Sequence, residues 1–96
     1  MITIKVRTIL TLKRILGDGE FEFTIPEGNT LREFLAELIH QWGDEFASYV
    51  FNEDRRVVLP HIRLMVNGQD IAFLNGMDTT LKEGDEILIL PPASGG

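Results

Sequence analysis

The chain has 96 residues, enough for one domain but too few for a deep catalytic cleft between two lobes, which weighs against most classes of enzyme. Apolar residues make up 44% and charged residues 25%, as in ordinary globular proteins. Cysteine is absent, which excludes disulfides, thiolate metal sites and cysteine nucleophiles and is typical of a reducing compartment.

The charge balance is acidic, with nine basic residues against fifteen acidic ones and a net charge of −6. Nucleic-acid phosphates and anionic membranes repel such a chain, so we expect it to bind neither. A basic protein is the natural partner. No apolar run approaches the roughly 20 residues that span a bilayer, and the N-terminus lacks the apolar core of a signal peptide, so we expect a cytoplasmic protein.

The first part of the chain predicts two strands. Residues 2–7 alternate between apolar and polar side chains, the period of a strand with one face on a core. Residues 9–16 are apolar with two interspersed basic residues and receive no element, and 17–19 form a turn. Residues 20–25 alternate again and predict a second strand, which ends at the Pro-Glu-Gly sequence 26–28.

One principal helix follows, over residues 30–42. Thr30 and Glu33 have the spacing of a capping box, in which the Thr hydroxyl accepts from the amide three residues on and the Glu side chain reaches back. The apolar positions recur in steps of three and one and draw a single stripe: Leu31, Phe34, Leu35, Leu38, Ile39 and Trp42. Gly43 suits the position after the helix end, and residues 46–50 predict a short second helical piece.

The second half predicts three more strands. Residues 62–66 alternate and run into Asn67-Gly68, a dipeptide that favours a tight type I′ hairpin turn because both residues tolerate a positive φ. Residues 71–73 would then form a short return strand and 86–90 the last strand. The order β-β-α-β-β-β with one amphipathic helix predicts a two-layer α+β domain.

The last strand differs from the others because its apolar residues 87–90 do not alternate, so both of its faces avoid water. One face meets the helix, and the chain is too short to cover the other with a second layer. Strand parity places one set of side chains on this open face: Lys5, Arg7, Ile9, Arg63, Met65 and either Leu88 with Leu90 or Ile87 with Ile89. Such an exposed apolar patch indicates a partner-binding site, unless the irregular loop 74–81 covers it.

Residues 91–96, Pro-Pro-Ala-Ser-Gly-Gly, carry no ionisable side chain. The prolines stiffen the base of this tail and stop strand pairing, and the stretch reaches roughly 20 Å when extended. The two glycines leave no bulk near the Gly96 carboxylate, so the tail could enter a narrow channel of another protein with an ionised group at its tip. A frayed end or a cloning remnant would explain the same glycines.

Four stretches stand out as a set: Lys5-Val6, Val66-Asn67-Gly68, Leu81-Lys82-Glu83-Gly84-Asp85-Glu86-Ile87 and Pro91-Pro92-Ala93-Ser94-Gly95-Gly96. With the β-β-α-β-β-β order, they resemble the MoaD/ThiS family of ubiquitin-like sulfur carriers, and most of all the branch that forms the small subunit of molybdopterin synthase. The resemblance implies a ubiquitin-like β-grasp fold. It would have a five-stranded mixed sheet with the first and last strands parallel in the middle, a domain over residues 1–90 and a flexible tail over 91–96.

The resemblance also implies a carrier cycle driven by other proteins. A MoeB-like adenylating enzyme would use ATP to activate the Gly96 carboxylate, and a persulfide sulfur would replace AMP to leave a thiocarboxylate. The tail, tipped by Gly95 and Gly96, would then enter a MoaE-like large synthase subunit and give its sulfur to a molybdopterin precursor, in molybdenum or tungsten cofactor synthesis. The chain would be a carrier subunit whose active-site chemistry its partners supply. It would bind no cofactor directly, since it lacks a phosphate-binding glycine loop.

Position in the family implies which residues contact these partners. The docking face would include residues on the open face and at the base of the tail: Ile9, Met65, Ile71, Phe73, Leu88, Leu90, Pro91 and Pro92. This choice selects Leu88 and Leu90, rather than Ile87 and Ile89, as the outward pair.

Other functions stay open from the sequence. The chain could be a ubiquitin-like modifier joined through Gly96 to lysines of target proteins, a sulfur carrier for thiazole or amino-acid biosynthesis, or a binding module with an incidental Gly-Gly end. No metal site is expected. His40 and His61 lack a second ligand at metal spacing, and the acidic residues 18–22 lack the ligand spacing of a calcium loop.

Overall fold

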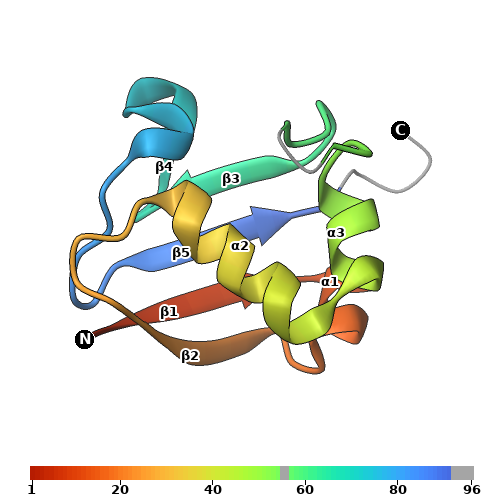
Figure 1. Cartoon of the computed structure of the whole chain (residues 1–96), viewed down its shortest axis with the longest axis horizontal. Coiled ribbons are helices and arrows are strands. Elements are labelled where there is room, and N and C mark those ends of the chain that lie inside the picture. The colour runs from red at the N-terminus through yellow and green to blue at the C-terminus, as the bar shows by residue number, and fades with distance from the viewer. Residues whose placement is uncertain (55–56, 92–96) are drawn as a thin grey trace.

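Five strands and three helices make up the part of the chain that the computed structural model describes, residues 1–54 and 57–91 (Figure 1). In chain order they are β1 Ile2–Thr8, α1 Leu10–Leu16, β2 Glu20–Ile25, α2 Leu31–Trp42, α3 Asp44–Val50, β3 Arg63–Val66, β4 Gln69–Asp70 and β5 Glu86–Leu90. Two single turns of 3-10 helix lie between β4 and β5, η1 Ile71–Phe73 and η2 Gly76–Asp78.

The strands form one mixed sheet in the order β2-β1-β5-β3-β4. β1 and β5 are parallel and lie in the middle, and the other neighbouring pairs are antiparallel. Helix α2 crosses one face of the sheet, and α3 follows it directly in the chain (Figure 1). The predicted β-grasp arrangement, with its central parallel pair and one principal helix, is therefore confirmed.

The core lies between α2 and the inner face of the sheet. Along β1, Ile4 and Val6 are buried while Lys5 and Arg7 are exposed, as the alternation predicts. Helix α2 buries four side chains of its apolar stripe: Leu31, Phe34, Leu35 and Leu38. Full burial of one such side chain contributes roughly 1.5–3 kcal/mol, so this stripe holds the helix on the sheet.

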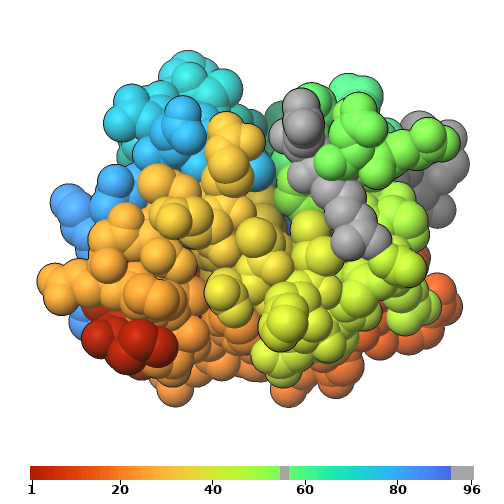
Figure 2. All heavy atoms as spheres, in the orientation of Figure 1, coloured from red at the N-terminus to blue at the C-terminus, as the bar shows by residue number. Residues whose placement is uncertain are grey.

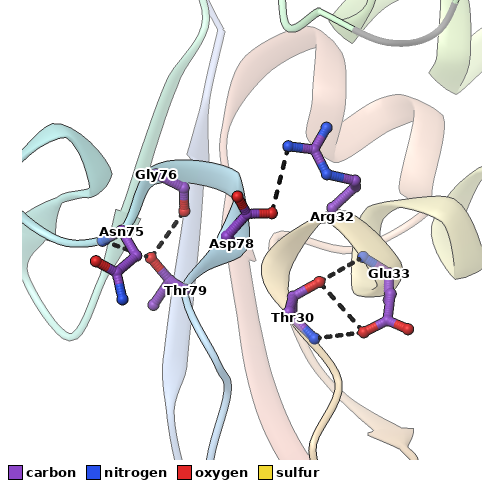
Figure 3. A network of polar contacts seen from close by, with 7 residues as sticks. All are labelled: Thr30, Arg32, Glu33, Asn75, Gly76, Asp78 and Thr79. Atoms are coloured by element: carbon purple, nitrogen blue, oxygen red, sulfur yellow. Dashed lines mark hydrogen bonds and ion pairs between the residues drawn. The ribbon is translucent and has the colours of Figure 1, made fainter.

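Both ends of α2 match the sequence pattern. The Glu33 amide donates to the Thr30 hydroxyl over 3.3 Å, and the Thr30 amide donates to the Glu33 carboxylate over 2.9 Å (Figure 3). The two bonds satisfy backbone groups that the first turn leaves free. At the other end the Gly43 amide donates to the Ile39 carbonyl over 2.7 Å, and Gly43 adopts a φ of 74°. The capping box and the glycine end of the helix are confirmed.

The turn between β3 and β4 has the predicted geometry, with positive φ at both Asn67 (51°) and Gly68 (85°). Asn67 also ties the hairpin to the turn before β5. The side-chain nitrogen of Asn67 donates to the Asp85 carboxylate, and the side-chain oxygen of Asn67 accepts from the backbone amide of Glu86, both over 2.9 Å. This second role fixes the central strand β5 against β3.

Two segments differ from the prediction. Residues 10–16, which received no element, form α1 with Leu12 and Leu16 buried four positions apart on one face. Residues 71–73 do not form a return strand, because the Asp70 side chain accepts from the Ala72 amide over 2.9 Å and turns the chain into η1. The return strand is β4 and is only two residues long.

Among the described residues, no helix combines the length and the apolar character that crossing a bilayer requires. The tail residues 92–96, including Pro92, Gly95 and Gly96, lie outside the described residues, as do 55–56.

Candidate partner-binding surface

The face of the sheet that α2 does not cover presents an apolar group in its middle, which we call the open-face patch: Met65, Leu88 and Leu90. The strand register places Leu88 beside both Arg7 of β1 and Met65 of β3, and places Leu90 beside Arg63. The three apolar side chains are half-buried, whereas Ile87 and Ile89 of the same strand are fully buried on the helix side. Leu88 and Leu90 are therefore the outward pair, and no described loop buries them.

Charged side chains surround the open-face patch. On one flank, Arg7 of β1 lies 3.5 Å from both Glu20 and Glu86, and Lys5 lies 3.7 Å from Glu20. On the other flank, Arg63 lies 3.5 Å from Asp70. Exposed pairs of this kind contribute only roughly 0–1 kcal/mol each. An apolar centre with a charged rim is the usual anatomy of a protein interface.

The remaining docking residues predicted from the sequence fall into two groups. Ile9, which follows β1, and Phe73, in η1, expose 48% and 83% of their surface, so both are available to a partner. Ile71 is half-buried against the core, and Pro91 is buried. Contact of either residue with a partner stays a prediction.

A buried hydrogen bond holds the end of β5 in place. The Thr8 hydroxyl donates to the Ile89 carbonyl over 2.6 Å, and Thr8 is the buried polar residue of the described core. A buried hydroxyl is costly without a partner, so this bond ties the ends of the two central strands together just before the chain leaves the sheet at Pro91. This role of Thr8 was not predicted from the sequence, although a Thr at an inward position of an apolar strand is a usable signal.

The described residues contain no group of three or more His, Asp or Glu side chains able to hold a metal ion. In that same part of the molecule, every buried side-chain nitrogen or oxygen has a hydrogen-bond partner.

A β-grasp sheet with an open apolar face defines a ubiquitin-like protein. Within that class the chain belongs to the ThiS family, whose model matches residues 9–96. The family comprises ubiquitin-like sulfur carriers, so the resemblance stated from the sequence is confirmed.

Three relatives extend over nearly the whole chain. Small archaeal modifier protein 3 of Haloferax volcanii is 26% identical over 97% of this chain and 98% of its own length. A Pyrococcus furiosus structure, provisionally named molybdopterin converting factor subunit 1, is 26% identical with a TM-score of 0.77 and covers 97% of this chain and 100% of its own. A chain of the Amycolatopsis orientalis BexX/CysO complex is 26% identical with a TM-score of 0.73, covering 97% and 99%.

These relatives place the chain among carriers and modifiers of the ubiquitin-like type without separating the two roles. The CysO relative was solved in a complex with another protein, BexX. Members of the family therefore work with partner proteins, as the sequence predicts in general terms.

Proposed function

We propose that this chain is a sulfur carrier for molybdopterin biosynthesis, activated at the Gly96 carboxylate. The observation that supports it most is the placement of β5. This strand is paired on both sides, presents Leu88 and Leu90 of the open-face patch on its outward face, and leads directly into the Gly-Gly tail. A partner that docks on the patch therefore receives the tail in a defined direction, which raises the effective concentration of the carboxylate at its active site.

The proposed chemistry proceeds in three steps on partner proteins. The Gly96 carboxylate attacks the α-phosphate of ATP on a MoeB-like enzyme, which gives an acyl adenylate and releases pyrophosphate. The terminal sulfur of a persulfide on a donor protein attacks the acyl carbon, AMP leaves and an acyl disulfide forms. A thiol then cleaves the S–S bond of this acyl disulfide, which leaves a disulfide on the donor side and releases the thiocarboxylate. On a MoaE-like large subunit this group transfers its sulfur to the pterin precursor, and water supplies the oxygen with which the acyl group returns to a carboxylate.

The composition of the chain fits a cycle in which partner proteins supply the sulfur and the ATP site. With no cysteine in the sequence, the sulfur has to come from outside the chain. The sequence contains no phosphate-binding glycine loop, so the ATP site belongs to the activating enzyme. The chain contributes the carboxylate, the tail and the docking face.

Similarity to a small archaeal modifier protein favours a second candidate, a modifier joined through Gly96 to lysine amines of target proteins. Both functions share the adenylation step and differ in the acceptor. A thiazole or amino-acid biosynthesis role would keep the thiocarboxylate and change only the final acceptor.

Intact-mass spectrometry of the chain isolated from its own cells tests the proposal. A free species heavier by one sulfur-for-oxygen exchange, together with sulfur transfer to the pterin precursor in the presence of the large subunit, is the expected result. A ladder of lysine conjugates without the thiocarboxylate species would favour the modifier. If cells that contain the activating enzyme yield neither the thiocarboxylate species nor lysine conjugates, both the carrier function and the modifier function are wrong.

A further inference from the structure

The outer edge of β3 has a strand neighbour along only part of its length. β4 pairs with Met65 and Val66 and ends at Asp70, where the chain turns into η1 (Figure 1). In the described part of the chain no strand lies beside residues 62–64 on this side, whereas β5 pairs with Arg63 and Leu64 on the other. A free strand edge of this kind is a template for another extended chain.

The backbone of this stretch directs hydrogen-bonding groups to the free side. The Asn67 amide donates to the Glu86 carbonyl over 2.8 Å, and bonded pairs alternate along an antiparallel ladder, so Arg63 also bonds to β5. Neighbouring groups across a trans peptide point in opposite directions, which turns the Ile62 carbonyl and the Leu64 amide away from β5. Within residues 1–54 and 57–91, no backbone amide donates to the Ile62 carbonyl.

A cavity of about 720 Å³ opens along this free edge. Its lining comes from residues 57–64, the segment 70–77, the start of α2 and the end of β5. Figure 2 shows the surface notched along its upper rim, between the cyan segment of residues 70–78 and the green loop. The volume lies within the range of roughly 300–1,000 Å³ that is typical of ligand sites. Because loops flank the edge at both ends, the cavity suits a short extended segment rather than the edge strand of a second folded copy.

The lining combines apolar walls with cationic side chains. Its apolar part includes Val58, Leu59, Ile71 and Met77. Its polar part, among the described residues, comprises Arg32, His61, Arg63 and Asp70. The two arginines outnumber the single carboxylate, on a chain whose net charge is −6. The cavity therefore favours a carboxylate between apolar groups, although the whole-chain charge favours basic partners.

Both arginines hold carboxylate partners that another carboxylate can replace. Arg32 reaches from α2 to Asp78 of η2 over 3.5 Å (Figure 3), and Arg63 reaches Asp70 over 3.5 Å. More than half of each arginine side chain is exposed, at 53% and 66%. Such pairs are weak in water, so an exchange of partners costs little.

We propose that this cavity binds an extended segment of a partner protein, which adds to the β3 edge as a short strand and carries an acidic residue between two apolar ones. Residues 62–64 span roughly 10 Å, enough to pair with three residues of the segment. Side chains of paired strands alternate in step, so an acidic residue beside Arg63 places its two neighbours on the side of Ile62 and Leu64. Both Ile62 and Leu64 line the cavity. The site makes no use of the Gly96 carboxylate, so it applies to a carrier and to a modifier alike.

Titration of the isotope-labelled full chain with the peptide acetyl-Ser-Val-Asp-Val-Ser-amide tests the proposal by nuclear magnetic resonance. The amide signals of Ile62, Arg63 and Leu64 should shift with dose, and the Arg63 Hα should show Overhauser contacts to the peptide backbone. The control peptide is N-methylated on Val-Asp-Val, which keeps the side chains and removes the backbone donors, so it should not bind. No shift at millimolar peptide, shifts confined to the open-face patch, or equal binding of the methylated peptide would overturn the proposal.

A charge exchange tests the side-chain preference. Arg63→Glu should weaken binding of the Asp peptide about tenfold and should strengthen binding of the same peptide with Lys in place of Asp. Arg14→Glu, on the exposed side of α1 and outside the described lining, is the matched control and should leave both affinities unchanged. Thermal unfolding confirms that Arg63→Glu is folded, as expected for a side chain that is 66% exposed. Unchanged affinities of a folded Arg63→Glu variant for both peptides would show that the proposed carboxylate site is wrong.

Discussion

At the scale of single residues, β5 serves two surfaces with neighbouring side chains. Ile87 points to the core and is fully buried, whereas Leu88 points to the open face between Arg7 and Met65. Apolar side chains on both faces explain why the sequence of this strand does not alternate. A charged residue in place of Leu88 on the open face should weaken partner binding, whereas a charged residue in place of Ile87 in the core should destabilise the fold.

Replacement of Leu88 tests this division. Leu88→Asp should weaken binding to the adenylating partner by about tenfold or more, because it places a carboxylate in the apolar centre of the interface. It should lower the free energy of unfolding by less than about 1 kcal/mol, since the side chain keeps access to water. Titration calorimetry and urea denaturation provide the two measurements. Ile87→Asp, the matched control, should unfold the chain, and partner binding of Leu88→Asp at wild-type affinity would show that the patch is not the docking site.

Phe34 makes the equivalent test of the core. It is fully buried on α2, and its ring packs edge-on against Phe23 of β2 with 5.8 Å between centroids. Phe34→Ala should lower the free energy of unfolding by about 3–5 kcal/mol, from lost apolar burial and the cavity that remains. Phe73→Ala removes the same atoms from a residue that is 83% exposed, so it should change the free energy of unfolding by less than about 0.5 kcal/mol. Equal losses in urea denaturation would contradict the assigned core.

At the scale of elements, the capping box of α2 gives a measurable contribution from two hydrogen bonds. Thr30→Ala removes the acceptor of the Glu33 amide and should destabilise the chain by about 1 kcal/mol, within a range of roughly 0.5–2 kcal/mol. Thr30→Ser keeps the hydroxyl and should retain most of the stability. The comparison uses thermal or urea unfolding, and a Ser variant as unstable as the Ala variant would assign the effect to the lost methyl group instead.

Elements with a strong local signal were predicted from the sequence, and those that depend on tertiary contacts were not. Helix α2 has a capping box, a single apolar stripe and a terminal glycine, all of which are local. Helix α1 has seven residues and lacks a side-chain cap, and the burial of Leu12 and Leu16 stabilises it in the fold. The segment 71–73 has apolar residues that suit a strand, but the Asp70 side chain bonds the local backbone and bends it.

The candidate surface shows the same limit. Parity along each strand predicts which side chains share a face, so the flanks of the open-face patch followed from the sequence. The choice between Leu88 and Ile87 needed the family resemblance, because β5 is apolar on both sides. The cavity was not predictable, because Arg32, His61 and Met77 come from separate elements that only the tertiary fold brings together.

At the scale of the whole molecule, one hydrophobic core joins both central strands of the sheet. The buried core runs from Ile2 to Ile89, and the hydrogen bond from Thr8 to the Ile89 carbonyl fixes the strand end. Stability and activation should therefore depend on different parts of the chain.

Deletion of Gly95 and Gly96 tests that separation. Under the proposed function it should abolish ATP–pyrophosphate exchange by the adenylating partner, because the shortened chain ends in the Ser94 carboxylate, which is both too far back and bulkier at its α-carbon. The free energy of unfolding should change by less than about 0.5 kcal/mol, since glycine has no side chain to bury. Ser94→Ala at full length is the control and should be activated normally. Exchange retained by the truncated chain would mean that the partner does not use this end, whereas a large loss of stability would mean that the tail is part of the folded body.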